Sequence, residues 1–562
     1  MRSEVTREAR GERRKACRAV AVGRAETVQS QAASRVRYRR DRFTPLSSLL
    51  SPLLLLAAVM LSLAPPAAGQ TAAAYAQHCA NCHGADRLGG SGPALLPENL
   101  ERLRRPEALK VIAAGRTATQ MPGFGDKLRA DEIEALASHI YTPLAQAPQW
   151  GEREIRASRV EHHKPGSLPD KPAFKADPLN LFVVVEGGDH HVTILDGDRF
   201  EPLHRFASRY ALHGGPKFTP EGRYVFFASR DGWVSKFDLY NLKTVAEIRA
   251  GINTRNLAVS GDGKFVMVAN YLPHTLVLLD ADLNLMKILE ARDSEGRKTS
   301  RVSAVYDAAP RRSFVAALKD IPEVWEISYD EHAEPIPVGL IHDFRLKEGA
   351  FLPGRFNPRR SVLTEYLDDF FFTPSYNELM ATSRDGGKGQ VVHLDVRRKI
   401  ATIEVPGMPH LASGITWDYQ GRTVMATPNL REGVVTVVDV KSWQTVKHIK
   451  TLGPGFFMRS HEKTRYAWVD AMMSPHRDTL QVIDKQKLEV VASVTPEPGK
   501  TLAHIEFTRD GRYALASLWE NDGALIVFDA ETLKEVKRIP MRRPVGKYNV
   551  YNKITRSEGT SH

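Results

Sequence analysis

Strand-length runs of aliphatic and aromatic residues, separated by short turns, recur from Pro178 to the C-terminal part of the chain. Each unit contains a turn with Gly or Asp, an aliphatic run, a second turn and another aliphatic run that closes on Asp. Five copies are regular and three are less regular. The regular copies are Phe218 to Leu239, Val259 to Leu283, Trp417 to Ser442, Glu462 to Lys487 and Phe507 to Thr532, and the others are Pro178 to Phe200, Ala309 to Asp330 and Thr373 to Arg398.

The aspartates that close these units keep a nearly constant spacing. Asp196, Asp238 and Asp280 are 42 residues apart, and Asp395, Asp439, Asp484 and Asp529 are 44, 45 and 45 residues apart. Short β-branched strands at this period predict a propeller, because a four-stranded blade can bury its faces only against neighbouring blades. A stacked helical solenoid is disfavoured because the runs have the length of strands. We therefore predict an all-β, eight-bladed β-propeller over residues 178–562.

Residues 70–145 have a helical pattern instead. Ile133, Leu136 and Ile140 share one face of a predicted helix over Ala130 to Tyr141, and shorter helices are expected at Ala72 to His78 and Glu107 to Ala114. The segment 146–177 is rich in proline and charge. It is predicted to be a linker between a small helical domain and the propeller.

A cysteine motif follows the first of these predicted helices, Cys79-Ala80-Asn81-Cys82-His83. C-x-x-C-H is the attachment signature of c-type haem, in which both thiols are joined to the porphyrin and the adjacent histidine binds the iron. Met121 lies 38 residues after His83, as expected of the second axial ligand. Zinc or thiol-disulfide chemistry is the alternative, but no other cysteine lies nearby. We predict a small all-α class I cytochrome c domain with one covalent haem c.

Residues 1–69 have the order of a secretory signal. A basic stretch, Arg35 to Arg42, precedes an apolar segment, Leu49 to Leu63, and the small residues Ala67-Ala68-Gly69. The apolar segment is short for a membrane-spanning helix. We expect cleavage near Gly69 and a periplasmic location, which agrees with haem attachment outside the bacterial cytoplasm. An uncleaved N-terminal anchor is the alternative, and Cys17 has no expected role.

The net charge of +12 is concentrated in this leader. Residues 1–69 contain 13 Lys or Arg and 5 Asp or Glu, a net charge of +8, which leaves only about +4 for the remainder of the chain. The charge balance of the two predicted domains therefore gives no indication of a nucleic-acid partner.

Several polar residues occupy the same phase of the repeat, just before the first strand of a unit. They are His213, Arg255, His410, His461 and His504. In a closed ring this phase would bring them to one end of the central channel. Imidazoles and a guanidinium in one pocket suit an iron porphyrin with carboxylate side groups, because imidazole binds iron and guanidinium pairs with carboxylates. The alternative for each histidine is a structural hydrogen bond in a tight turn.

A haem c motif followed by eight such units resembles the cytochrome cd1 family, whose propeller carries d1 haem. The resemblance covers residues 72–552. The matching stretches are Val192 to Asp198, Tyr210 to His213, Gly222 to Gly232, Pro409-His410 and Gly546 to Asn552. It implies that His213 is the proximal ligand of the d1 iron, that Arg230 and Arg255 lie near the d1 carboxylates and that Asn270-Tyr271 lines the pocket.

The family that the chain resembles has members with two different activities. One member reduces nitrite to nitric oxide with a pair of distal histidines, and the other is a dihydro-haem d1 dehydrogenase that oxidises a propionate of the d1 precursor to acrylate. Only His410 of the histidine pair is matched, and Asp368 and Asp369 stand where the other would fall. The short segment before Cys79 and the C-terminal tail from Asn552 to His562 also favour the dehydrogenase.

The expected activity is therefore the last step of d1 haem biosynthesis, with electrons leaving through haem c. His410 is the first candidate for the base or a distal iron ligand, followed by His461 and His504, and Asp368 or Asp369 could orient the histidine. The expected partners are the d1 precursor, a soluble c-type cytochrome as electron acceptor and cd1 nitrite reductase as the recipient of d1 haem. A nitrite reductase and a non-enzymatic d1 carrier are the alternatives.

Overall fold

A computed structural model describes residues 68–90, 92–101, 103–115, 121–343, 348–383 and 388–555. Cys17, the apolar segment of the predicted leader and the last residues of the predicted tail lie outside these ranges. Within them, no helix combines the length and the apolar character needed to cross a membrane.

The N-terminal part is helical. Its helices are α2 (Ala68–His78), α3 (Ala80–His83), α4 (Pro97–Leu100), α5 (Arg105–Ala114) and α6 (Ala130–Tyr141). Helix α6 begins after Arg129, whose backbone N–H donates to the Glu132 carboxylate, and it buries the face that carries Ile133, Leu136 and Ile140. These side chains pack with Tyr75 of α2, so one apolar core joins the first and last helices.

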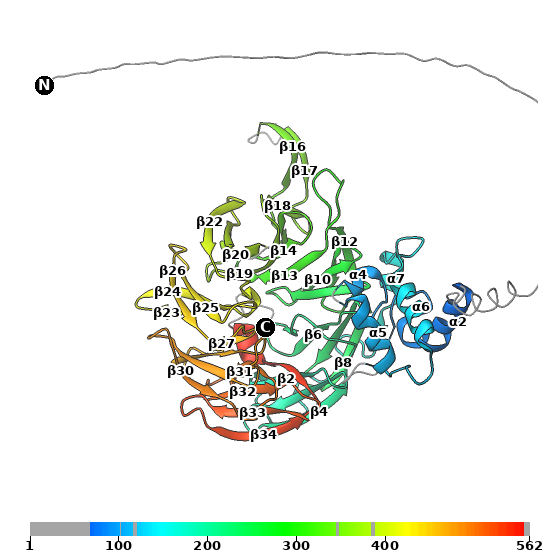
Figure 1. Ribbon diagram of the computed structural model, residues 1–562. Coiled ribbons are helices and arrows are strands. Elements are labelled where there is room, and N and C mark those ends of the chain that lie inside the picture. The colour runs from blue at the N-terminus through cyan, green and yellow to red at the C-terminus, as the bar shows by residue number, and fades with distance from the viewer. Residues whose placement is uncertain are drawn as a thin grey trace, which may run out of the picture. The chain divides into compact units, whose positions relative to one another are not determined.

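The rest of the chain forms eight four-stranded antiparallel sheets in a ring (Figure 1), which confirms the predicted fold class. The ring opens with η1 (Pro178–Asn180), β2 (Leu181–Glu186), β3 (His191–Asp196) and β4 (Glu201–Ala207). The next four blades contain β5 (Lys217–Phe218), β6 (Tyr224–Ala228), β7 (Trp233–Asp238), β8 (Lys243–Arg249), β9 (Asn253–Val259), β10 (Phe265–Leu272), β11 (Thr275–Asp280), β12 (Leu285–Glu290), β13 (Val302–Ala308), β14 (Ser313–Leu318), β15 (Glu323–Ser328), β18 (Pro358–Val362), β19 (Leu367–Phe372), β20 (Glu378–Ser383), β21 (Lys388–His393) and β22 (Arg398–Glu404).

Three more blades and a closing strand complete the ring. They contain β23 (Ile415–Tyr419), β24 (Arg422–Pro428), β25 (Val434–Asp439), β26 (Thr445–Lys450), β27 (Met458–Ser460), β28 (Tyr466–Asp470), β29 (Leu480–Asp484), β30 (Glu489–Val494), β31 (Leu502–Phe507), β32 (Tyr513–Leu518), β33 (Gly523–Asp529), β34 (Glu535–Met541) and β35 (Pro544–Asn549). Strand β35 pairs with β2, so the two ends of the propeller sequence share one blade. Helix α8 (Val550–Thr555) follows directly and packs against β2 and β5.

A hairpin and two 3₁₀ turns interrupt the repeat. The hairpin β16 (Ile336–Asp343) and β17 (Glu348–Leu352) separates the third and fourth strands of its blade, and the 3₁₀ turns η2 (Ala309–Arg311) and η3 (Leu411–Ser413) lie in other connections.

The segment predicted as a linker contains α7 (Glu152–Ala157) and β1 (Val160–Glu161), and β1 adds a fifth strand to the outer edge of a blade by pairing with β8. The segment is therefore fastened to the propeller.

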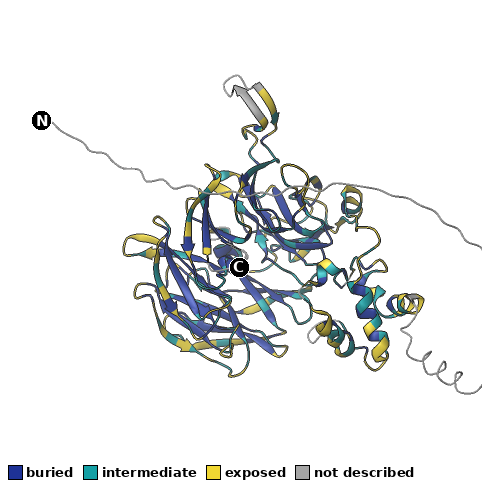
Figure 2. Ribbon diagram, turned by 45° about the horizontal axis from the view of Figure 1, so that its top comes forward, coloured by how far each residue is buried: buried dark blue, intermediate teal, exposed yellow. Residues whose placement is uncertain are grey.

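Burial decreases from the inner to the outer strands of the blades (Figure 2). Every residue of β2 and β31 is buried, whereas β30, an outermost strand, alternates between exposed and half-buried residues. Facing blades enclose large side chains, and Trp325 and Trp468 are completely buried between them. This gradient explains why the repeat is recognised in the sequence mainly from the aliphatic runs of the buried inner strands. The exposed outer strands contribute little to it.

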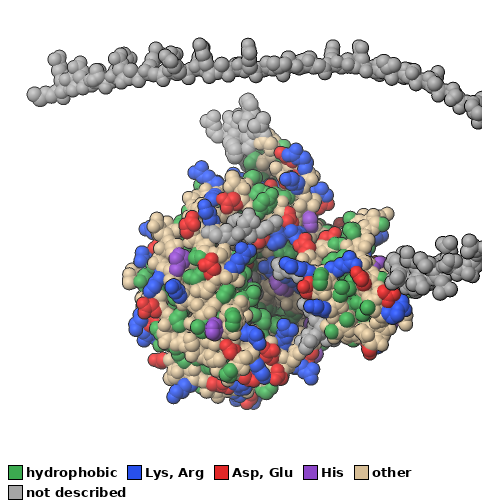
Figure 3. Space-filling view, viewed as in Figure 1, with side chains coloured by type: hydrophobic (Ala, Val, Ile, Leu, Met, Phe, Trp, Pro, Cys, Tyr) green, Lys and Arg blue, Asp and Glu red, His purple; other side chains and the backbone are tan. Residues whose placement is uncertain are grey.

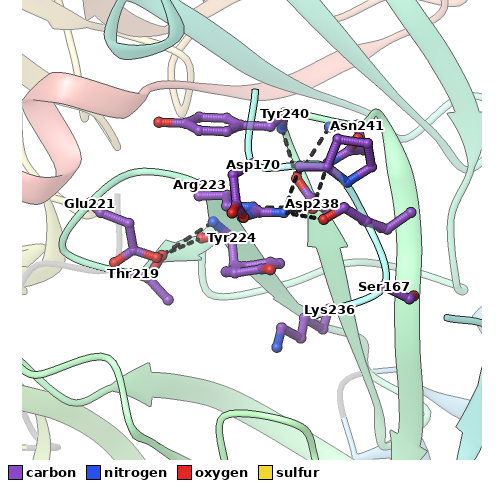
Figure 4. Close-up of polar contacts among 12 residues, drawn as sticks. Ser167, Asp170, Thr219, Glu221, Arg223, Tyr224, Lys236, Asp238, Tyr240 and Asn241 are labelled. Atoms are coloured by element: carbon purple, nitrogen blue, oxygen red, sulfur yellow. Dashed lines mark hydrogen bonds and ion pairs between the residues drawn. The ribbon is translucent and has the colours of Figure 1, made fainter. Parts of the chain in front are cut away.

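The closing aspartates hold the turn after the third strand of a blade. Asp238 Oδ1 accepts hydrogen bonds from the backbone N–H groups of Tyr240, at 2.8 Å, and Asn241, at 3.2 Å. Its other oxygen pairs with Arg223 Nη2 at 3.0 Å, and Arg223 Nη1 also reaches Asp170 of the fastened segment at 2.6 Å (Figure 4). One buried carboxylate thus connects a turn, a neighbouring strand and the segment before the propeller.

Replacing Asp238 by Ala should lower the free energy of unfolding by about 3 to 5 kcal/mol, because Arg223 and two backbone N–H groups lose a fully buried acceptor. Asp280→Ala is the matched control, since the half-buried Asp280 holds the equivalent turn with hydrogen bonds from Asp282 and Asn284. It should cost about 1 kcal/mol. Urea unfolding followed by far-UV circular dichroism measures both, and equal losses would contradict the proposed role of the arginine pair.

Candidate functional site

A cavity of about 340 Å³ lies on the propeller axis, at the end where the first strand of each blade begins and the second strand ends. We call it the front cavity. Because adjacent strands are antiparallel, residues just before β5, β23 and β27 meet residues at the end of β10 and just after β6 and β32. Its lining includes His213, Arg230, Arg255, Tyr271, Lys319, Asp368, Asp369, His410, Phe456, Phe457, Trp519 and Tyr548. Figure 3 shows that the ring is hollowed at its centre.

His213 lies in the loop that leads into β5. Its Nδ1 is 2.8 Å from the Arg255 carbonyl oxygen, and its Nε2 is 2.9 Å from Arg230 Nη2. With Nδ1–H donated to the carbonyl, Nε2 is the ring nitrogen that an iron in the cavity would bind. Gly214 follows with φ of 82°, and a Cβ there would lie 2.6 Å from the Asn256 side chain. Glycine therefore allows this loop to lie flat against β9.

Cationic side chains surround Tyr271 at the edge of the front cavity. The Arg230 guanidinium and the Lys319 ammonium each lie 5.9 Å from its ring centroid. Lys319 also forms a 2.6 Å ion pair with Asp368. Together with Arg255, these cations suit the carboxylate groups of a large anionic ligand.

His410 precedes η3 and faces the same cavity. Its Nδ1 is 2.6 Å from the Phe456 carbonyl oxygen, and its ring lies 4.0 Å from that of Phe456. Burial, together with the positive charge of Arg255, lowers the pKa of His410 to about 4 despite the hydrogen bond to Phe456. The imidazole is therefore neutral at pH 7, with Nδ1 as the donor and Nε2 as a proton acceptor.

Two of the predicted catalytic histidines do not face the front cavity. In the blade of His461, Phe456 and Phe457 precede β27 and line the front cavity. His461 follows the same strand, so it lies at the other end of the ring and lines a separate cavity there. His504 lies inside β31 at a bulge and is buried behind Phe457, with ring centroids 4.8 Å apart. The expected convergence of all four histidines is therefore wrong for these two.

The acidic pair splits into two environments. Asp368 is ion-paired with Lys319, whereas Asp369 Oδ1 accepts a 2.8 Å hydrogen bond from the Tyr306 hydroxyl. Burial raises the pKa of Asp369, while Arg255 and the Tyr306 hydrogen bond oppose that rise. Asp368 thus orients a cation, and Asp369 places a buried carboxyl group close to Arg255.

Three residues at or next to the front cavity, Lys319, Tyr306 and Trp519, are not among those predicted from the sequence. Lys319 and Trp519 come directly after the second strands β14 and β32, close to the positions of Arg230, two residues after β6, and Tyr271, at the end of β10. A search for polar and aromatic residues after the second aliphatic run of each unit, in addition to those before the first, would have found both. Tyr306 has no such signal, because it lies within the buried strand β13.

A second, largely apolar cavity of about 140 Å³ lies in the helical domain, and Cys79, Cys82, His83 and Met121 all contribute to its lining. No disulfide joins the two cysteines. His83 Nδ1 lies 2.7 Å from the Pro93 carbonyl oxygen, so Nε2 is the nitrogen that can bind a metal. Two thiols, an oriented imidazole and a thioether around an apolar cavity form the donor set of a c-type haem, and the residues fit this group.

Two parts of the chain match models of known families. Residues 176–553 match the Cytochrome D1 heme domain. The chain belongs to the cytochrome d1 haem domain family. Residues 66–140 match subunit III of cbb3-type cytochrome c oxidase, which agrees with the cytochrome c domain of this family member.

Individual relatives extend this assignment. The chain is 56% identical over 491 residues to the dihydro-heme d1 dehydrogenase of Pseudomonas aeruginosa, covering 87% of this chain and 95% of that protein. A nitrite reductase of Stutzerimonas stutzeri is 25% identical over 535 residues, covering 85% and 91%. The solved structure "Dihydro-heme d1 dehydrogenase NirN in complex with DHE" matches with a TM-score of 0.80 and 55% identity, covering 86% of this chain and 99% of that chain. The predicted resemblance to the dehydrogenase branch is confirmed.

Replacing His213 by Ala should abolish stable binding of d1 haem, because the ligand loses its proximal nitrogen while the carboxylate-binding cations remain. Absorption titration with d1 haem measures the loss, and the haem c spectrum should not change. His448→Ala is the control, since His448 is exposed on the outer strand β26. Unchanged d1 binding by the His213 variant would contradict the proximal assignment.

Proposed function

We propose that this protein is a dihydro-haem d1 dehydrogenase that oxidises a propionate side chain of the d1 precursor to acrylate. The observation that carries the proposal is the front cavity, where an oriented histidine, three cations and a neutral, proton-accepting histidine lie together. The identity of 56% to a dihydro-heme d1 dehydrogenase over nearly its whole length supports the same activity.

The chemistry defines what the chain must supply. Converting –CH2–CH2–COO⁻ to –CH=CH–COO⁻ releases two electrons and two protons. His213 would hold the substrate iron, and Arg230 and Arg255 would pair with substrate carboxylates and so select which propionate reaches the base. His410 Nε2 would then accept a proton from that side chain. Asp368 would act indirectly, by orienting Lys319 through their ion pair.

Electrons need a separate exit from the substrate. Cys79 and Cys82 would hold a single covalent haem c, with His83 and Met121 as axial ligands, and this group supplies one-electron redox chemistry when bound. Arg249 of β8 donates a hydrogen bond to the Leu88 carbonyl, so the backbone close to the haem motif is fixed to a propeller blade. We propose a soluble c-type cytochrome as the electron acceptor.

The biological setting follows from the same proposal. We infer a periplasmic protein exported by a cleaved signal peptide, since covalent haem attachment takes place outside the bacterial cytoplasm. It would complete d1 haem for denitrification and deliver the product to cd1 nitrite reductase. The nitrite reductase activity itself is disfavoured, because the family resemblance implies that Asp368 and Asp369 replace the second distal histidine of that enzyme, and the identity to a nitrite reductase is only 25%.

Mass spectrometry of the bound tetrapyrrole tests the proposed activity. Anaerobic protein loaded with dihydro-d1 haem and given an oxidised c-type cytochrome should convert the substrate to a product that lacks two hydrogens. A d1 carrier would leave the mass unchanged, and a nitrite reductase would instead produce nitric oxide from nitrite. An unchanged mass with full oxidant present would rule out the dehydrogenase.

The pH dependence of kcat/KM tests His410 as the base. Because the base must be neutral, kcat/KM should keep its neutral-pH value below pH 6.5, the usual pKa of histidine, and decline only as the pH approaches about 4. His410→Gln should lower kcat by about 100-fold or more and remove this acidic limb. A decline centred near pH 6.5 in the wild type would indicate a different base.

A further inference from the structure

A cavity of about 620 Å³ lies at the opposite end of the propeller axis. We call it the rear cavity. The ends of β23, β27 and β31 contribute to it, and its inner lining includes Arg459, His461, Glu506 and Asn552. Exposed Glu462 and Lys463 lie at its rim. None of these residues takes part in binding or dehydrogenation as proposed above.

Ionisable side chains occupy the axis between the front and rear cavities. Tyr548 lines the front cavity, and the Lys553 ammonium of α8 lies 5.3 Å from the Tyr548 ring centroid. From the rear, the Asn552 amide donates to Glu506 Oε1 at 3.1 Å, and Glu506 Oε2 lies 3.7 Å from Arg459. These groups form a line of polar side chains between the two cavities.

Four buried polar atoms of this line have no hydrogen-bond partner among the described residues. They are Arg459 Nε, Glu506 Oε2, Asn552 Oδ1 and Lys553 Nζ. Buried donors and acceptors in native proteins are almost always satisfied, either by protein or by ordered water. Donors and acceptors are mixed here and a large cavity adjoins them, so bound water satisfies these atoms better than an anion or a cation would.

The lysines on this axis are suited to exchanging protons. Burial and the charge of Arg459 lower the pKa of Lys217 to about 7, opposed by Asp369, and Lys217 donates to the Gly214 carbonyl at 3.1 Å. Burial also lowers the pKa of Lys553, and the positive charges of Arg459 and Lys217 lower it further. The negative charge of Glu506 opposes this shift. Lys217 can therefore be neutral or charged near neutral pH, and Lys553 releases its proton more readily than a solvated lysine does.

We propose that this axis is a proton outlet, which carries protons from the front cavity past Tyr548 and Lys217 to Lys553 and Glu506 and releases them at the rear cavity. The inference rests on the proposed dehydrogenase activity. Oxidation of one propionate releases two electrons, which a haem c held by Cys79, Cys82, His83 and Met121 would pass to the acceptor, and two protons, which the outlet would deliver to solvent. With bound substrate filling the front cavity, the rear cavity provides a route that the substrate does not block.

Two substitutions interrupt the outlet, Glu506→Gln and Lys553→Met. Each should slow dehydrogenation about tenfold with saturating oxidant, increase the solvent isotope effect in D2O and leave d1 affinity unchanged. The matched controls are Glu462→Gln and Lys463→Met at the exposed rim, which should behave as wild type. Formate, a small acid that can replace the carboxylate, should restore part of the rate of Glu506→Ala, which a purely structural defect would not allow.

The outcomes separate this inference from the activity itself. If the wild type removes no hydrogens, the proposed function fails. If it does remove them and both outlet variants match it in rate and isotope effect, protons leave through the front cavity and the outlet is wrong. Slower variants without an altered isotope effect or formate rescue would also overturn it, because the substitutions would then act only on structure.

Discussion

Ring closure is the constraint on which the rest of the molecule depends. Strand β35 completes the blade that β2 begins, and the register runs from Phe182 opposite Asn549 to Glu186 opposite Pro544. Buried amides reinforce it, since Asn549 donates to Asn180 at 3.0 Å. Only in a closed ring do the beginnings of eight first strands meet around one axis. The front cavity is therefore a product of closure, and no single blade contains a site.

The periodic part of the fold could be predicted from sequence because one physical device recurs. An aspartate at the end of the third strand accepts backbone N–H groups of the next turn, as Asp439 does from Lys441 and Ser442. The less regular fifth blade uses a histidine in this role. His393 ends the third strand β21, and its Nδ1 accepts the backbone N–H of Asp395. The predicted closing residue Asp395 is therefore displaced by two positions, although the number of units is unaffected.

The site was only partly predictable from the sequence. The position of a residue within the repeat does not determine whether it lies before or after its strand, and so at which end of the ring. His213 and His410 precede their strands and reach the front cavity. His461 belongs to a blade whose first strand has three residues, so it lies beyond that strand at the opposite end. Such short strands and the bulge at His504 depend on packing with neighbouring blades, which the local sequence does not record.

The cations of the front cavity impose opposite requirements on its base. Arg255 helps to attract an anionic substrate, but the same charge contributes to the low pKa of His410 and so weakens it as a proton acceptor. Bound carboxylates would offset that charge and remove its share of the lowering, while the larger effect of burial would remain. Base strength would then increase when substrate is present, so Arg255, which helps to select the substrate, would also affect the protonation of the group that acts on it.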